Sequence, residues 1–224
     1  MKKIIALLLV LVMVMAMAAC GNETENKVDN GENNQVETNQ PETNEGEGEE
    51  NKEEVPATNG ALVILETIWN SYAEDEKFFI NGGDTQGHIE KMEADENYQP
   101  PMAPGVYNLE YAEDLSGAFV IPADDVANAD EAATMTHGMN ANNFSCAALH
   151  LKDGTDVAAF AENVKTAMKS NQWICGQPET LLVVSFGDGY VLVAFGVNDA
   201  MGPFETKLTG AYESAEILVK ESLI

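Results

Sequence analysis

The sequence predicts an α+β domain of two layers, with an antiparallel sheet of about four strands built from two ββα units. A strand at 144–151 whose alternate residues form two faces, and a hairpin at 180–195 made of two apolar runs joined by a short Gly-containing loop, indicate antiparallel strands. A stretch with helical apolar spacing follows each strand pair. From residue 131 the order strand, strand, helix therefore occurs twice. We expect both of these helices on one face of the sheet, and the N-terminal helix and a long excursion at 81–117 on the other.

The first twenty residues carry a leader pattern. Two lysines precede an unbroken apolar run from Ile4 to Ala19, and Cys20 follows. This ending resembles a lipobox, which implies diacylglycerol on the Cys20 sulfur, cleavage just before it, and a signal peptide at 1–19. The run of 16 residues is short of the roughly 20 that a bilayer core requires. A transmembrane helix, or a plain signal peptide cut elsewhere, are the alternatives.

Residues 20–58 form a separate compositional segment. They consist mainly of Asn, Glu, Thr and Gly and contain almost nothing apolar, so we expect a disordered, lipidated acidic tether. Residues 59–224 then form a single globular domain. This domain holds 26 acids against 7 lysines, a net charge of −19, and the chain has no arginine. Nucleic acid is excluded as a partner because phosphate contacts require clustered cations. The acidity also favours lipid rather than surface charge as the membrane attachment.

In the N-terminal half of the domain, only the first helix has a clear sequence pattern. Leu62 to Tyr72 has helical spacing, whereas the apolar run Lys77 to Ile80 fits either a short strand or a buried turn. The excursion at 81–117 shows no sustained period, and we expect one strand in it, near Val106 to Tyr111. Pro122 to Val126 has the proline and acids of a helical first turn.

The C-terminal half has clearer patterns. Residues 131–139 fit a strand, or a helix as far as Thr134, and 140–143 a turn. The strongest element is a helix with apolar residues at 157, 160, 161, 164, 167 and 168. The hairpin strands are apolar on both faces, so both faces of the sheet must be covered. Pro203 opens the last helix, whose apolar positions extend to Val219.

Several short motifs resemble the C-terminal domain of a family of lipoproteins from Gram-positive anaerobes. They are Asn140–Phe144, the turn Lys152–Gly154, Asn171–Trp173 and Gly187–Val191. That domain has no known function, although some relatives carry the label bacteriocin transport accessory protein. The resemblance covers roughly 59–224, implies an exported setting, and supplies no catalytic residues.

The candidate site residues are few. With Cys20 lipidated, Cys146 and Cys175 remain as a pair, either bridged or as two buried free thiols. Met135, His137 and Met139 form one candidate binding surface and Trp173 a second, with core packing as the alternative for each. We expect no metal, cofactor or catalytic residue, since no histidine is placed beside a cysteine and no metal-ligand spacing appears.

These observations predict a membrane-anchored extracytoplasmic lipoprotein on the outer face of the cell membrane. Its specific role is undefined, and binding or accessory work at the membrane–wall zone is the preferred interpretation. Its expected partners are the lipid bilayer, through the acyl chains on Cys20, and a membrane or cell-wall protein. The alternative is a wall-zone enzyme with an unfamiliar site in the 81–117 excursion.

Overall fold

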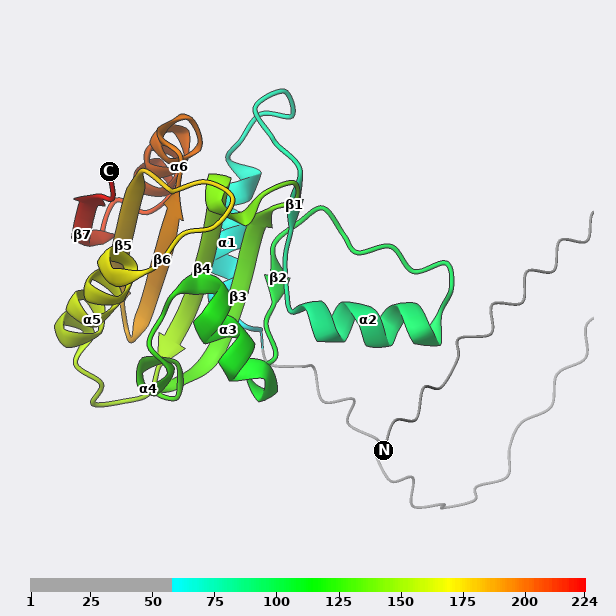
Figure 1. The fold of residues 1–224 in the computed structure, drawn as a ribbon, viewed down its shortest axis with the longest axis horizontal. Helices are drawn as coiled ribbons and strands as arrows, with labels where there is room; N and C mark the ends of the chain where they lie inside the picture. Colours follow the sequence, from blue (N-terminus) through cyan, green and yellow to red (C-terminus); the bar gives the residue numbers. More distant parts are fainter. Residues whose placement is uncertain (1–57) are drawn as a thin grey trace, which may run out of the picture. The chain divides into compact units, whose positions relative to one another are not determined.

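The computed structural model describes residues 58–224. The predicted signal peptide, the lipidated Cys20 and the tether as far as residue 57 lie outside the described residues. Within them the fold is α+β, with an antiparallel sheet of seven strands and six α-helices (Figure 1). The four predicted strands are present as β3 (Ala129–His137), β4 (Phe144–Leu151), β5 (Thr180–Gly187) and β6 (Tyr190–Gly196).

The prediction of about four strands was too low because it did not count three edge strands, two of which lie beside the short runs at 77–80 and 106–111 where a strand was one expectation. These are β1 (Ile80–Asn81), β2 (Gly105–Val106) and β7 (Glu216–Ser222). The sheet order is β1-β3-β4-β6-β5-β7, and β2 pairs with β3 beside β1. β1 and β2 have two residues each, too few to show a period. β7 is mostly exposed, and its apolar residues do not alternate regularly. It is a strand because it pairs with β5, and this tertiary contact has no signal in the local sequence.

The helices cover both faces of the sheet. On one face α5 (Val157–Ser170) packs beside α3 (Ala112–Phe119) and α4 (Ala123–Val126). On the other, α1 (Gly60–Asn70) packs beside α6 (Asn198–Ala211), and Figure 1 shows α1 behind the sheet and α3 in front. The remaining helix, α2 (Thr85–Ala94), buries no side chain.

The predicted placement of helices on the two faces was wrong, and so was the two-layer description. The helices of the two ββα units, α5 and α6, lie on opposite faces of the sheet, and α1 and the excursion helix α3 are likewise separated. The strand pattern itself is confirmed: Leu181 and Val183 belong to one core, Leu182 and Val184 to the other. Because both faces of these strands are apolar, the sequence required helices on both faces of the sheet, but it did not show which helix lies on which face.

The last helix also differs from the prediction. It begins at Asn198, so Pro203 lies inside it rather than at its start, and it ends at Ala211. Proline lacks the N–H that would bond one turn back, and its place on the exposed side of the helix leaves that carbonyl near water. Residues 157–168 and 144–151 fold as predicted, and residues 131–137 adopt the strand alternative.

The excursion begins and ends on one edge of β3. β1 pairs with the end of β3 through Ile80 opposite His137, and β2 pairs with its middle through Gly105 opposite Thr134. The chain between them forms α2, which projects away from the sheet in Figure 1. This arrangement places the residues around 82–84 next to those around 105–108, and it creates the cavity described below.

Candidate functional site

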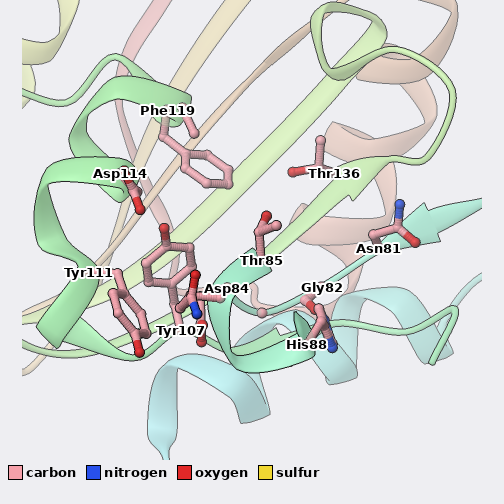
Figure 2. A pocket seen from close by; sticks show the side chains of 13 residues that line it. Asn81, Gly82, Asp84, Thr85, His88, Tyr107, Tyr111, Asp114, Phe119 and Thr136 are labelled. Atoms are coloured by element: carbon pink, nitrogen blue, oxygen red, sulfur yellow. The ribbon is translucent and has the colours of Figure 1, made fainter. Parts of the chain in front are cut away.

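A cavity of 430 Å³ lies between the start of α2, the segment after β2, and α3. All but one of its lining residues come from the 81–119 stretch, and the exception is Thr136 on β3. Figure 2 shows Tyr107, Tyr111 and Asp114 on one side of the cavity and Thr85, Asn81 and His88 on the other. The volume falls within the range of small-molecule pockets.

Gly82 and Gly105 allow two segments of the chain to cross closely beside this cavity. A Cβ on Gly82 would lie 2.3 Å from the backbone nitrogen of Gly105, so the two segments cross at a distance that only glycine permits. The hydroxyl of Thr134 accepts from the Gly83 N–H at 3.0 Å and reaches the Gly83 carbonyl at 3.2 Å. β3 therefore holds the backbone that leads into α2 in one position.

Asp84 is a buried carboxylate with a structural task. It is 8% exposed, and its Oδ1 accepts from the Gly87 N–H as the N-cap of α2. Its Oδ2 accepts from the Asn108 N–H at 3.2 Å, across the crossing of the two segments. Asp84 thus joins the start of α2 to the chain after β2 and brings a negative charge to the cavity wall.

His88 has both ring nitrogens in use. Nε2 lies 2.7 Å from the Gly82 carbonyl oxygen, and Nδ1 lies 2.9 Å from the Tyr98 hydroxyl. Because a carbonyl can only accept, Nε2 carries the proton, and in the neutral ring Nδ1 accepts from Tyr98. The imidazole is therefore committed to holding α2 against the chain on either side of it, and it has no free nitrogen to serve as a base.

Tyr107 differs from these neighbours because its hydroxyl is free. The residue is only 7% exposed, but its hydroxyl is not among the fully buried atoms: it makes no hydrogen bond to residues 58–224 and opens on the cavity. Figure 2 shows it turned toward Asp114, at the wall of the cavity. Burial, then the negative charges of Asp114 and Asp84, raise the pKa of Tyr107 to about 12. The hydroxyl consequently stays protonated near neutral pH.

Tyr111 closes one side of the cavity and is tied to α2. Its hydroxyl donates to Glu90 Oε1 at 3.0 Å, and this hydrogen bond is the main reason that the pKa of Tyr111 is raised. Asp114, in the first turn of α3, makes no hydrogen bond or ion pair with any other side chain in the part of the chain described. No lysine lines the cavity. The wall therefore combines aromatic rings with two carboxylates.

The arrangement does not hold the parts of a known catalytic or metal centre. Within residues 58–224 no group of three or more His, Cys, Asp or Glu side chains could hold a metal ion. A nucleophile activated by a neighbouring base requires a base with a free position, and His88, the only histidine at the cavity, has none. Among the lining groups without a hydrogen-bond partner in the described residues, the Tyr107 hydroxyl and the Asp114 carboxylate are suited to bind a ligand through hydrogen bonds and charge.

None of the residues predicted as a binding surface lines this cavity, and Trp173 lies apart from the other three. Met135 is fully buried in the α1–α6 core, so its placement on a surface was wrong. His137 stacks on Phe78 at 5.5 Å, and Met139 is 80% exposed. Trp173 packs on Phe195 at 5.3 Å, on the opposite face of the sheet from Met135, and lines a separate hollow of 290 Å³.

The two cysteines are free thiols. Cys146 is buried on the α1 side of β4, and burial raises the pKa of its thiol, whereas Cys175 is exposed in the loop after α5. The loop does reach the start of β4, since the Asn140 and Asn142 side-chain amides donate to carbonyls of residues 174–176. The Cys146 side chain, however, is buried in the core beneath α1 and α6, and the structure has no disulfide between it and Cys175.

The sequence predicted that the 81–117 excursion could hold a site, but it did not identify the individual residues that line the cavity. Asp84 did carry a signal, because an Asp at the start of a stretch free of proline is a common N-cap. Tyr107 and Asp114 carried none, since their proximity depends on how α3 packs against the sheet.

No family model, no curated protein and no solved structure matches this chain. The resemblance to lipoproteins of Gram-positive anaerobes therefore stays a prediction from short motifs. None of the helices between residues 58 and 224 is long and apolar enough to cross a membrane.

Proposed function

We propose that this chain is an extracytoplasmic lipoprotein, anchored to the cell membrane through acyl chains on Cys20, whose domain acts by binding. The leader pattern and the acidic segment that follows it support the anchor and the location. At the membrane–wall zone such a domain would hold a small solute, or would serve a membrane or cell-wall protein as an accessory.

The observation that carries the binding role is the Tyr107 hydroxyl. The hydroxyl opens on the cavity and no other group among the described residues engages it, so it can both donate to and accept from whatever occupies the cavity. Tyr107 is buried and its hydroxyl is unpartnered, while Asp84 and His88 beside it are fully bonded. A ligand in the cavity would satisfy the hydroxyl.

The second candidate function is a wall-zone enzyme with its site in the excursion. The convergence of Asp84, His88 and Asp114 at one cavity favours it, because active sites gather titratable groups. Binding is preferred because the two groups that would act as acid and base, Asp84 and His88, are occupied in holding α2.

The two functions give different results in one experiment. The full lipoprotein, purified in detergent, is incubated with a small-molecule extract of the cell wall, and mass spectrometry follows both the protein-bound and the free compounds. A binder retains a compound unchanged, at no more than one molecule per chain, and loses it in Tyr107→Phe. Consumption of many molecules per chain would establish the enzyme instead.

The anchor is tested separately. Cys20→Ser removes the sulfur that would carry the lipid, so the protein should appear in the medium or remain uncleaved. Unchanged acylation and membrane retention of this variant would contradict the proposed attachment.

A further inference from the structure

The cavity beside α2 has a lining with a distinct chemical character. Tyr107, Tyr111 and Phe119 contribute aromatic rings, and Asp84 and Asp114 contribute carboxylates. Lys91 is the one lysine in the 81–119 stretch, and it does not line the cavity. It lies over the Tyr98 ring at the wall of a neighbouring hollow. Aromatic faces and carboxylates both attract positive charge, because the face of a ring carries partial negative charge.

The two carboxylates differ in what they can offer a ligand. Asp84 already accepts backbone N–H groups with both oxygens. Asp114 lies in the first turn of α3 and has no bonding partner between residues 58 and 224. Its negative charge is therefore available to a cation, while that of Asp84 adds to the potential at the same cavity.

Tyr107 supplies an independent observation that points to a ligand. Its side chain is more than nine-tenths buried, and its unpartnered hydroxyl reaches the cavity near Asp114 (Figure 2). Burial is the largest cause of the raised pKa of this hydroxyl, and the charges of Asp114 and then Asp84 raise it further through a negative potential at its oxygen. A neutral hydroxyl oxygen in a negative potential is a suitable acceptor for the N–H of a cation.

We propose that this cavity binds a small soluble organic cation that carries an ammonium group on a short apolar chain. The ammonium would lie between the Asp114 carboxylate and the Tyr107 hydroxyl oxygen, and the apolar chain would lie against Phe119 and the tyrosine rings. A domain with a net charge of −19 from 26 acids and 7 lysines would also concentrate cations at its surface. This inference rests on the proposed binding function and names its ligand class.

Three probes with nearly the same apolar chain separate charge from size. Pentylammonium carries the cation, 1-pentanol replaces it with a neutral hydroxyl, and norleucine adds a carboxylate beside the ammonium. Each is titrated into the full lipoprotein in detergent, with binding followed by ligand-observed NMR. We expect pentylammonium to bind about tenfold more tightly than 1-pentanol, because a hydrogen bond to a charged group is worth more than a neutral one. Norleucine should bind more weakly than pentylammonium, since its carboxylate meets Asp84 and Asp114.

Variants locate the binding at this cavity. Asp114→Asn should weaken pentylammonium about tenfold, and Tyr107→Phe, which removes only the hydroxyl oxygen, should weaken it severalfold. Asp124→Asn is the matched control, because it removes the same charge from an exposed residue of α4 that does not line the cavity. Its affinity for pentylammonium should equal that of the parent chain.

The outcomes that overturn the inference also distinguish it from the proposed function. Equal binding of 1-pentanol and pentylammonium, with Tyr107→Phe weakening both, would reject a cation and keep the cavity as a binding site. Loss of affinity in Asp124→Asn as large as in Asp114→Asn would show attraction to the acidic surface alone. Absence of binding by all three probes would reject the ligand class and would also count against the cavity as the binding site.

Discussion

Asp84→Ala is the change that most directly tests how α2 is held in place. α2 has ten residues and buries none of its side chains. A helix of that length is marginal by itself in water, so it depends on contacts at its ends. Asp84 caps the first turn through Gly87 and bonds to the Asn108 N–H at 3.2 Å. The alanine removes both hydrogen bonds at once.

The expected loss follows from these two bonds. Replacing an Asp N-cap by Ala costs about 1 kcal/mol. A hydrogen bond to a charged acceptor contributes about 1.5–3 kcal/mol, and the two terms are not strictly additive. We therefore expect α2 to open more easily by about 2 kcal/mol or more. Such a change corresponds to an increase of about 30-fold in the opening equilibrium.

Hydrogen exchange of the amides in α2 measures this opening directly. In Asp84→Ala these amides should exchange about 30-fold faster, or lose protection entirely, while those of β4 should change far less because α2 contributes nothing to the core. Asp84→Asn should have a smaller effect, since Asn is an equally good N-cap. Asp156→Ala is the matched control: Asp156 caps α5, which buries four side chains, so the loss should appear as reduced global stability without local opening.

Two results would refute this reasoning. Unchanged exchange in α2 would show that its cap and the bond to Asn108 do not hold it. A loss of protection in β4 as large as that in α2 would show that the excursion and the sheet unfold as one unit.

The remaining predictions concern a histidine and the two thiols. His150 hydrogen-bonds to Asp130, and this raises the pKa of the imidazole in the folded state. The stabilisation from the protonated imidazole is therefore complete below the unfolded pKa of about 6.5. It disappears as the pH rises through the folded pKa. Urea unfolding of the parent chain and His150→Gln should therefore differ most near pH 6 and converge in alkali, and a constant difference would contradict the pairing. Alkylation without reductant should label Cys175 at once and Cys146 only after unfolding, and intact mass checks it: protection of both thiols before reduction would indicate a bridge.

The sequence predicted some elements correctly and others not. The strand at 144–151 was predicted with its true bounds, and its alternate residues do enter opposite cores, because alternation along one strand is a local property. The helix at 157–168 was equally clear from its apolar spacing. β7 was mistaken for the end of a helix, since apolar residues continue at helical spacing as far as Val219, whereas residues 216–222 form a strand by pairing with β5.

The candidate site was only located by region. The 81–117 excursion was expected to carry any unfamiliar site, and the cavity lies there. Asp84, Tyr107 and Asp114 were not identified. Asp84 lies more than twenty residues before Tyr107 and Asp114, and no spacing rule connects the three. They meet because β1 and β2 share one edge of β3 and because α3 packs on the sheet face next to that edge.

The sequence by itself determined the leader pattern, the acidic composition, the four central strands and the requirement that both faces of the sheet be covered. Each of these depends on composition or on a period read within a few residues. Only the tertiary structure decided which helices cover which face, where the short edge strands pair, and that a buried tyrosine presents a free hydroxyl to a cavity beside two carboxylates. Those features arise from contacts between distant segments, whose free energies no local pattern records.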